Sequence, residues 1–394
     1  MIIGIVGKPN VGKSTFFKAL TLAEVAIAPY PFTTIEANQG IGFIKTDCIE
    51  KELKTKCRPK YGYCTGGKRF IPVKLVDVAG LVPGAHAGKG RGNQFLDDLR
   101  EADVLIHVLD ASGRTDAEGN PTQGYDLTFD VKFLQEEIEL WMYGIIKKYW
   151  NAFSRRIQME GKKLSQELAT QLSGLKINEG MIKAAMKNLN LSEKPLEWSE
   201  QNLFEFVREL RRVSKPIIIA ANKIDLPESA ENIKKLKKTF PEEVVVSCSA
   251  ESELALREAA KLELIEYTPD ESTFEVKKEL TEQQKKALSF VKEKILSVYG
   301  TTGVQKCINV AVFDFLRYNV IYPVENEHHY SDKKGNVLPD ALLMPSGSTT
   351  LDLAFAIHTD IGKNFLSAID VKSGKRLGKE HVLKNNDTIR ILVR

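Results

Sequence analysis

The chain has 394 residues, of which 43% are hydrophobic and 27% charged, and its formal net charge is +4. This composition is ordinary for a globular protein of two or three domains. No apolar run approaches the length of a bilayer span, which argues against a membrane partner, and the N-terminus resembles a strand rather than a leader peptide. We therefore expect a cytoplasmic protein.

The first motif is GKPNVGKS, from Gly7 to Ser14, which fits the phosphate-loop pattern G-x-x-x-x-G-K-[ST]. A short apolar strand at residues 2–6 precedes it, and a helix over residues 15–22 follows. In this context backbone N–H groups bind phosphate, Lys13 reaches the β- and γ-phosphates, and Ser14 coordinates Mg²⁺. The predicted nucleotide-binding residues are Gly7, Lys8, Pro9, Asn10, Val11, Gly12, Lys13, Ser14 and Thr15.

A proline-containing loop with the sequence YPFTT follows the first helix. A GTPase with a phosphate loop needs a threonine hydroxyl from a mobile loop to bind Mg²⁺ when the γ-phosphate is present. We expect Thr34 to supply this hydroxyl, with Thr33 as the alternative, and we include Phe32 among the nucleotide-binding residues.

Two strands, predicted at residues 40–44 and 70–76, pair with each other, and the second ends in the sequence DVAG. In GTPases with a phosphate loop, an Asp at the end of a strand acts on Mg²⁺, and a Gly three residues later contacts the γ-phosphate. Asp77 follows an apolar run, and Gly80 lies three residues after it. Asp77 would act on the metal through water, and the Gly80 N–H would bond the γ-phosphate.

The group that positions the attacking water is not evident, because Leu81 occupies the place of the Gln found in Ras-type GTPases. His86, in the glycine-rich stretch that follows, is a candidate for this role, and a solvated loop histidine is the alternative. The candidate catalytic residues are thus Lys13, Asp77, Gly80 and His86. Asn10 offers a second route if it binds K⁺ against the phosphates, and its alternative role is to favour the turn.

A long helical insertion interrupts the regular alternation of strands and helices after a buried strand at residues 104–110. Apolar residues recur at intervals of three and four from Val131 to Ile145 and again from Leu203 to Val213, which predicts a helical hairpin over residues 116–214. Between Ile145 and Lys194, ten Lys/Arg and four Glu give a local charge of +6. This basic arm favours ribosome or RNA as a partner, although a solvated helix face is the commoner meaning.

The sheet resumes at residues 217–221 and leads to the motif NKID. Asp225 can accept hydrogen bonds from N1–H and N2–H₂ of guanine, a donor pair that adenine lacks. We expect Lys223 to lie over the base and Asn222 to connect the loops. A strand at residues 244–246 then precedes Ser249, Ala250 and Glu251, whose backbone would reach guanine O6.

The C-terminal part begins with a predicted helix over residues 279–299. We expect a strand at residues 308–313, a polar loop at 325–335, a helix that begins near residues 348–352, and a closing strand up to Val393. This order predicts a small α+β domain of the β-grasp type without a catalytic constellation, and hence a binding module.

The five cysteines form no C-x-x-C pair. Cys57 and Cys64 could join Cys48 in a metal site, but we see no fourth ligand nearby. We therefore expect reduced thiols at all five positions, Cys248 and Cys307 included. A local disulfide is the alternative for a hyperthermophilic source.

Together, the motifs GKPNVGKS, YPFTT, DVAGLVPGAHAGKGRGNQFL, NKID and SAE resemble the Obg superfamily of GTPases, and within it the YchF branch. The tail LMPSGSTTLDLAFAIHTDIG resembles a TGS domain. The resemblance implies a Mg²⁺-dependent nucleotide hydrolase with a helical insert, associated with ribosome or RNA. It also implies that Leu81 is a feature of the group. Many members of this branch carry an altered base-reading motif and prefer ATP, whereas the unaltered NKID favours GTP here.

These observations predict an α/β protein with a P-loop G domain (residues 1–115 and 215–278), a helical insertion (116–214), a helical linker (279–303) and a TGS-like domain (304–394). The expected function is Mg²⁺-dependent hydrolysis of GTP to GDP in a switch associated with translation. An ATPase of the same fold, or a nucleotide-gated scaffold with incidental hydrolysis, are the alternatives.

Overall fold

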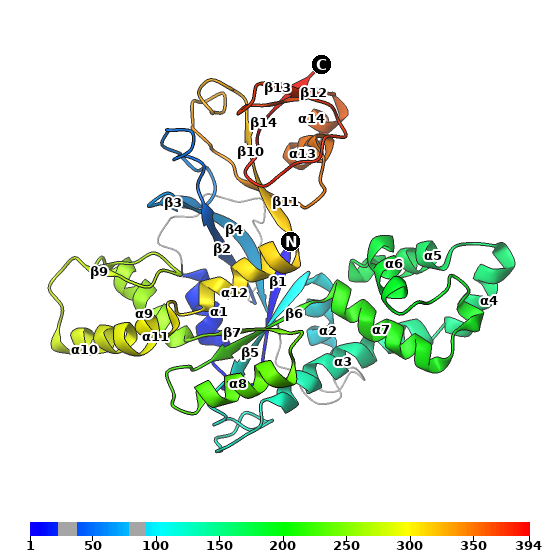
Figure 1. Ribbon diagram of the computed structural model, residues 1–394, viewed down its shortest axis with the longest axis horizontal. Coiled ribbons are helices and arrows are strands. Elements are labelled where there is room, and N and C mark those ends of the chain that lie inside the picture. The colour runs from blue at the N-terminus through cyan, green and yellow to red at the C-terminus, as the bar shows by residue number, and fades with distance from the viewer. Residues whose placement is uncertain (23–37, 79–91) are drawn as a thin grey trace. The chain divides into compact units, whose positions relative to one another are not determined.

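The computed structural model describes residues 1–22, 38–78 and 92–394, and Figure 1 shows their helices and strands. The chain divides into two compact units. The first consists mainly of Met1–Ala19 and Lys74–Cys307, and the second mainly of Ile41–Val73 and Ile308–Arg394. None of the helices in the described ranges is both long and apolar enough to cross a bilayer.

The first unit is built on a parallel sheet with the strand order β4-β1-β5-β6-β7. Strands β5 and β6 are buried at every residue, as expected for apolar parallel strands that are covered on both faces. The strand bounds are β1 (Ile2–Val6), β4 (Lys68–Asp77), β5 (Val104–Asp110), β6 (Ile217–Asn222) and β7 (Val244–Ser247). The carboxyl ends of these strands therefore meet at one edge, where open α/β sheets bind ligands.

Two further strands belong to this sheet. Strand β2 (Gln39–Asp47) neighbours β4, and the short β3 (Tyr63–Thr65) pairs with β4 in the antiparallel direction. The sheet thus has seven strands in the part of the chain that the structure describes. The strand pair predicted at residues 40–44 and 70–76 corresponds to β2 and β4.

The predicted helical insertion consists of two longer helices connected by shorter ones (Figure 1). A continuous apolar core runs along it, in which Trp198 packs against Trp150 and Phe206 with ring centroids 5.4 and 5.0 Å apart. Trp150 and Phe153 are buried in this core, whereas Tyr149 is exposed. The elements are α3 (Thr128–Lys147), α4 (Trp150–Glu160), α5 (Leu164–Gln171), η2 (Ser173–Leu175), α6 (Glu179–Asn188), η3 (Pro195–Glu197) and α7 (Glu200–Ser214).

Further helices complete the first unit. The predicted helix at residues 279–299 is present, but it contains a π-helical stretch, η4. The remaining elements are α1 (Lys13–Thr21), α2 (Gly92–Glu101), α8 (Ser229–Thr239), α9 (Ala250–Lys261), β8 (Ile265–Glu266), β9 (Glu275–Val276), α10 (Glu282–Phe290), η4 (Val291–Leu296) and α11 (Ser297–Tyr299).

The strand predicted at residues 308–313 is wrong. This segment belongs to α12 (Val304–Val310) and to the π-helical turn η5 (Ala311–Phe315). The β-branched residues of the segment suggested a strand. The buried residues recur at helical intervals of three and four: Val304, Cys307, Ile308, Ala311 and Val312.

The C-terminal part of the second unit is a small sheet with one main helix. Its five strands have the order β11-β10-β14-β12-β13, in which β10 and β14 are parallel and the other pairs antiparallel. The elements are β10 (Tyr318–Val324), β11 (Leu342–Pro345), α13 (Thr350–Ile357), α14 (Thr359–Lys363), β12 (Phe365–Asp370), β13 (Lys375–Leu377) and β14 (Thr388–Val393). The predicted fold class, a mostly parallel α/β sheet with a helical insertion and a small C-terminal sheet domain, is confirmed.

Candidate nucleotide-binding site

A cavity of about 540 Å³ lies where the loop after β1 meets the loops after β6 and β7. This volume is within the usual range for a small-molecule site. Residues of the predicted phosphate motif GKPNVGKS and of the predicted base-reading motif NKID line it. Leu226, which was not among the predicted site residues, also lines it. The lining residues are Lys8, Pro9, Asn10, Gly12, Lys13, Ser14, Thr15, Asn222, Lys223, Asp225, Leu226, Ser249, Ala250 and Glu251.

The side chain of Asn222 connects the three loops of the cavity. Its amide Nδ2 donates to the carbonyl oxygen of Val11 at 2.9 Å, and its Oδ1 accepts from the backbone N–H of Ala250 at 2.9 Å. Asn222 is only 3% exposed, so these two bonds satisfy buried polar atoms. The phosphate loop, the NKID motif and the SAE motif are therefore held in one arrangement by a single side chain.

Gly12 makes this approach of Asn222 possible. Its φ is +90°, a conformation that L side chains rarely adopt, and a Cβ atom at this position would lie 2.4 Å from Nδ2 of Asn222. The glycine of the motif is thus required both by the backbone conformation and by the neighbouring amide.

Lys13, at the first position of α1, pairs with the carboxylate of Asp77, at the end of β4. Its amine also donates to the carbonyl oxygen of Val78 at 2.9 Å. The amine predicted to bind phosphate and the carboxylate predicted to act on Mg²⁺ are therefore in direct contact. Ser14, the next residue of the helix, is exposed and lines the same cavity.

At the other end of the cavity, Asp225 accepts a hydrogen bond from the hydroxyl of Ser249 at 3.2 Å. Lys223 has a φ of +65°, and its amine donates to the carbonyl oxygen of Asn10 at 2.8 Å. The same amine contacts Asp110 at 2.9 Å. The stem of Lys223 thus crosses from the base-reading motif to the phosphate loop.

Asp110 is a contact that sequence reasoning missed. Burial alone would raise the pKa of this carboxyl, but hydrogen bonds from Ser112, Thr115 and Lys223 outweigh burial and lower the pKa. Asp110 therefore provides a buried negative charge that anchors the Lys223 amine. The signal that could have identified it is its place at the end of β5, on the ligand-binding edge.

Lys8, which also lines the cavity, is buried, and its amine contacts residues that follow β5. Its amine lies 2.7 Å from the carboxylate of Asp130, 3.0 Å from the carbonyl oxygen of Thr115 and 3.9 Å from the ring centre of Tyr125. Burial and the charge of Lys8 together lower the pKa of the neighbouring His107 to about 3. Lys8 thus fastens the first half of the phosphate loop to the start of the helical insertion.

Asn10 is fixed in a similar way. Its φ is +64°, and its side-chain amide donates to the carbonyl oxygen of Gly119 at 2.9 Å. The left-handed conformation is one that Asn adopts readily. Gly119 was not predicted from the sequence, because its contact with the loop depends on the path of the chain after β5.

Several predicted site residues fall outside the described ranges: Phe32, Thr33, Thr34, Gly80, Leu81 and His86. Of the predicted residues within the described ranges, Gly7, Val11 and Asp77 are not among those that line the cavity. The other phosphate-loop residues, Thr15, the NKID residues Asn222, Lys223 and Asp225, and the SAE residues line it.

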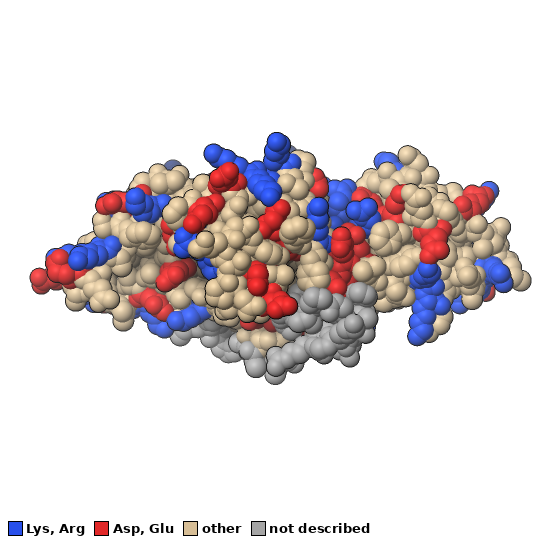
Figure 2. Space-filling model, turned by 90° about the horizontal axis from the view of Figure 1, so that it is seen from below, with Lys and Arg blue, Asp and Glu red and all other residues tan. Residues whose placement is uncertain are grey.

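The basic arm is largely compensated by acidic side chains. On the face drawn in Figure 2, Lys and Arg lie among Asp and Glu instead of forming one basic field. Six of the ten basic residues between Ile145 and Lys194 make ion pairs: Lys147 with Glu200, Arg156 with Glu167, Lys162 with Glu160, Lys176 with Asp103, Lys183 with Glu179 and Lys194 with Glu197. The arm therefore offers less unpaired positive charge than its sequence indicates.

Comparison with known families divides the chain into three parts. Residues 2–138 match the 50S ribosome-binding GTPase family, and residues 220–326 match the G4 motif-containing domain of Obg-like GTPases of the YGR210-like type. Residues 328–393 match the TGS domain.

Individual proteins resemble the chain over two thirds or more of its length. An uncharacterized GTP-binding protein of Methanocaldococcus jannaschii is 51% identical over 99% of this chain and 98% of its own. The ribosome-binding ATPase YchF of Mycoplasma genitalium is 31% identical over 68% of this chain and 70% of its own. The crystal structure of a GTP-binding protein from Pyrococcus horikoshii superposes with a TM-score of 0.81 and 43% identity, with full coverage of both chains.

Proposed function

The chain belongs to the Obg-like GTPases with a C-terminal TGS domain and is related to YchF, and from this premise we propose that it hydrolyses GTP with Mg²⁺ as a cytoplasmic switch in translation. In this proposal residues 1–115 and 215–278 form the G domain, 116–214 the arm, 279–303 a linker and 304–394 the TGS domain. The observation that carries it is the convergence of Lys13, Asn222 and Asp225 on one cavity.

Guanine selectivity rests on Asp225. Its carboxylate lines the cavity and has the acceptors for N1–H and N2–H₂ of guanine. An adenine in the same position would leave the carboxylate without donors, which is costly for a half-buried carboxylate. The contact with Ser249 holds the carboxylate ready for the base.

The phosphate end has the chemistry that Mg²⁺ and a triphosphate need. The Ser14 hydroxyl and the Asp77 carboxylate are oxygen donors of the kind that Mg²⁺ prefers, and Thr34 would complete the set. Bound Mg²⁺ would neutralise charge on the phosphates. The Lys13 amine pairs with Asp77 in this structure. When a nucleotide binds, this amine would leave the carboxylate and contact the β- and γ-phosphates.

We propose that His86, which lies outside the described ranges, positions the attacking water. The alternative is K⁺ held near Asn10. The hydrogen bond from Asn10 to Gly119 uses the amide nitrogen, so the side-chain oxygen would be the atom that faces a cation. A comparison of hydrolysis in K⁺ and Na⁺ buffers separates the two routes.

A role at the ribosome is supported by the family match of residues 2–138 and by the relative that is called a ribosome-binding ATPase. Four basic residues of the arm have no ion pair among the described residues and would face phosphate: Lys148, Arg155, Lys163 and Lys187. The name of this relative also supports the second candidate function, an ATPase of the same fold.

The test is co-sedimentation of the full chain with ribosomes from the source organism, together with GTP hydrolysis with and without them. The proposal expects ribosomes to bind the chain and to raise GTP turnover, and expects removal of Mg²⁺ by EDTA to abolish hydrolysis. A chain that neither sediments with ribosomes nor responds to them would remove the translation part of the proposal.

A further inference from the structure

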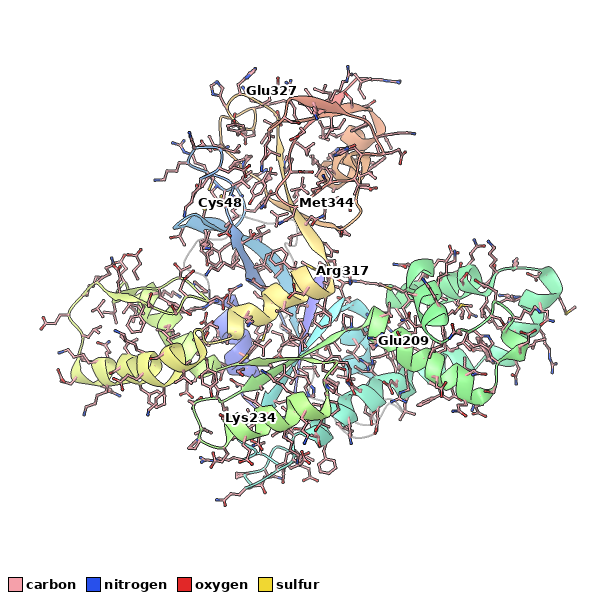
Figure 3. All side chains as sticks on the ribbon, in the orientation of Figure 1. Cys48, Glu209, Lys234, Arg317, Glu327 and Met344 are labelled. Atoms are coloured by element: carbon pink, nitrogen blue, oxygen red, sulfur yellow. The ribbon has the colours of Figure 1, made fainter. Side chains whose placement is uncertain are left out.

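The segment between β2 and β3 has no helix or strand of its own, although it is long for an irregular loop. It begins at Cys48, directly after β2, as Figure 3 shows, and Cys64 lies in β3. Its third cysteine, Cys57, is buried together with Cys48. Something other than regular backbone pairing must hold this segment in place.

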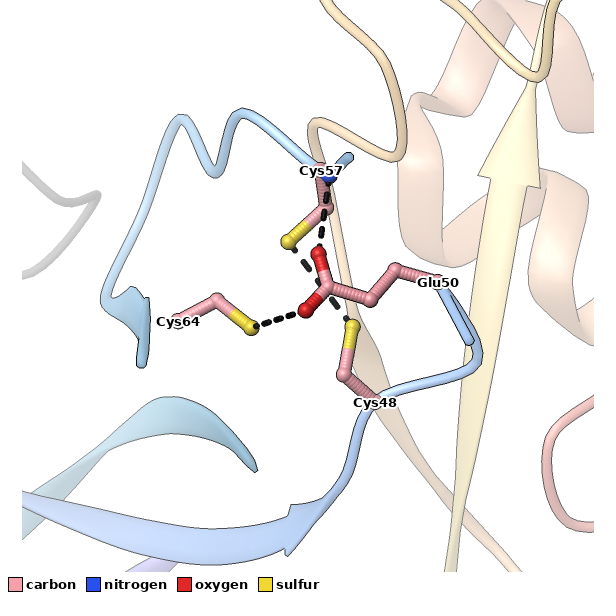
Figure 4. Close-up of side chains that lie close together, drawn as sticks. All are labelled: Cys48, Glu50, Cys57 and Cys64. Atoms are coloured by element: carbon pink, nitrogen blue, oxygen red, sulfur yellow. Dashed lines mark hydrogen bonds between the residues drawn. The ribbon is translucent and has the colours of Figure 1, made fainter. Parts of the chain in front are cut away.

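Three side chains of this segment and that of Cys64 in β3 converge on one point (Figure 4). The sulfur atoms of Cys48 and Cys57 are 3.7 Å apart, and the sulfur of Cys64 lies 3.4 Å from Oε1 of Glu50. One ligand atom from each of the four residues lies within 4.8 Å of all the others. Glu50 is the fourth ligand that the sequence did not reveal, so the expectation that none lies nearby is wrong.

The two short separations, 3.7 Å between sulfur atoms and 3.4 Å from sulfur to oxygen, match those of a tetrahedral zinc site. With Zn–S bonds of about 2.3 Å and a Zn–O bond of about 2.0 Å, neighbouring ligand atoms are roughly 3.8 Å (S to S) and roughly 3.5 Å (S to O) apart. We propose that Cys48, Glu50, Cys57 and Cys64 bind one Zn²⁺ ion. Three thiolates select a soft or borderline ion over Mg²⁺ or Ca²⁺, and four protein ligands leave no open position, so the site is structural.

The surroundings support the ligand geometry. The backbone N–H of Cys57 donates to Oε2 of Glu50 at 3.0 Å, which orients the other carboxylate oxygen toward the sulfur atoms. The backbone N–H of Cys48 donates to the carbonyl oxygen of Gly67 at 2.9 Å. Glu50 and Cys64 are partly exposed and provide a path by which the ion enters.

The site would stabilise the attachment of this loop to the C-terminal sheet domain within the same unit. The N–H groups of Arg58 and Lys60 donate to the carbonyl oxygens of Val337 and Pro339, both at 2.8 Å. The buried Arg69 donates to the carbonyls of Leu338 and Pro339 at 3.1 and 3.0 Å. A zinc ion that holds residues 48–64 in place would therefore also hold Arg58 and Lys60, whose N–H groups bond Val337 and Pro339.

The first experiment measures the metal content of the full chain, purified under reducing conditions without a chelator. We expect one zinc ion per chain by mass spectrometry. After removal of zinc, Co²⁺ should bind with a sulfur-to-cobalt charge-transfer band and the visible bands of tetrahedral coordination. A reduced chain that binds neither ion, or a cobalt spectrum without the charge-transfer band, would contradict the proposal.

Variants identify the ligands. Cys57→Ser and Glu50→Gln should each weaken zinc binding by at least ~10-fold. Cys307→Ser is the matched control, because Cys307 is also buried but faces Cys248, at 3.5 Å, in the first unit. If Cys57→Ser retains full zinc content, or if Cys307→Ser loses it equally, the assignment is wrong. The cobalt spectrum of the unmodified chain tests the site even where a variant fails to fold.

A third readout separates this site from nucleotide binding. Zinc removal should increase proteolysis within residues 48–64 and lower the thermal midpoint of unfolding, while GTP affinity stays unchanged, because the nucleotide cavity is lined by residues of the first unit only. Unchanged proteolysis after complete zinc removal would contradict the structural role.

Discussion

The amide of Asn222 donates to the carbonyl oxygen of Val11 at 2.9 Å, so the NKID motif and the GKPNVGKS loop share a hydrogen bond. The bond joins residues 211 positions apart in the sequence, and the same side chain also accepts from Ala250. A single side chain therefore connects the loop that we propose for phosphate binding to the two loops that we propose for base binding.

Replacement of Asn222 should affect both stability and GTP binding. Asn222→Ala leaves the buried carbonyl of Val11 and N–H of Ala250 without this partner, which costs about 1–3 kcal/mol of unfolding free energy. We expect GTP affinity to fall together with stability, as measured by urea unfolding and calorimetric titration.

Asn309→Ala is the control for this experiment. The Asn309 side chain bonds the backbone of Lys45 at 3.0 and 3.1 Å, within the second unit and away from the cavity lining. It should lose stability and keep GTP affinity. Equal losses of GTP affinity in the two variants would show that Asn222 has no special connection to the site.

Gly12→Ala should abolish nucleotide binding while the chain stays folded. The added Cβ would lie 2.4 Å from Nδ2 of Asn222, and the φ of +90° adds strain. Gly124→Ala is the matched control, because Gly124 also has a positive φ, of +70°, but no neighbouring atom within 4 Å. Fluorescence titration with a labelled GTP analogue compares the two, and normal binding by Gly12→Ala would refute the close packing.

Lys13→Ala should reduce GTP hydrolysis by at least ~100-fold, because an oriented cation at the reacting phosphate is typically worth this much. Lys18→Ala is the control on the same helix, since Lys18 is exposed and pairs with Glu258. Single-turnover hydrolysis with radiolabelled GTP measures both. A Lys13→Ala variant with ordinary turnover would exclude Lys13 from the chemistry.

His107 should make the chain sensitive to acid. Burial and Lys8 lower its pKa to about 3, from an ordinary value of 6.5. Between these two pH values the unfolded state binds a proton that the native state does not, so the unfolding free energy falls as pH falls, at roughly 1 kcal/mol per unit. Nδ1 of His107 has no hydrogen-bond partner among the described residues, so an apolar replacement is tolerable.

His107→Leu should therefore lose less stability than the unmodified chain between pH 6 and pH 4 (a window of roughly two units inside the range of these pKa values). Urea unfolding of the first unit at several pH values measures this difference. His381→Leu, at an exposed position of the second unit, should leave the profile of the first unit unchanged. Parallel profiles for His107→Leu and the unmodified chain would contradict the lowered pKa.

Much of the fold and the cavity could be predicted from the sequence because the signals are local. Gly12 and Lys13 belong to a loop between a strand and a helix, and Asp225 follows the end of β6. Each short motif therefore also indicates which secondary-structure elements flank it. The apolar periodicity of α3 and α7 likewise indicated the insertion. These features do not depend on how distant segments meet.

What could not be predicted depends on distant contacts or on ambiguous residues. The contact between Lys13 and Asp77 and the anchoring of Lys223 by Asp110 arise from strand neighbours far apart in sequence. Glu50 was not recognised as a companion of the three cysteines because a single Glu in a loop has no diagnostic spacing. The β-branched residues at positions 308–313 indicated a strand, whereas the burial of Cys307 in α12 and Ala311 in η5 reveals a helical stripe.

The most direct test of the account is a competition between GTP, ATP and XTP for the purified chain in Mg²⁺ buffer, carried out with the unmodified chain and with Asp225→Asn. We expect strong preference for GTP, and we expect Asp225→Asn to weaken GTP and favour XTP, because xanthine presents an oxygen where guanine presents N2–H₂ and the Asn amide can donate to it. If ATP displaces GTP equally well and Asp225→Asn changes nothing, the base does not meet Asp225 and the guanine reading is wrong.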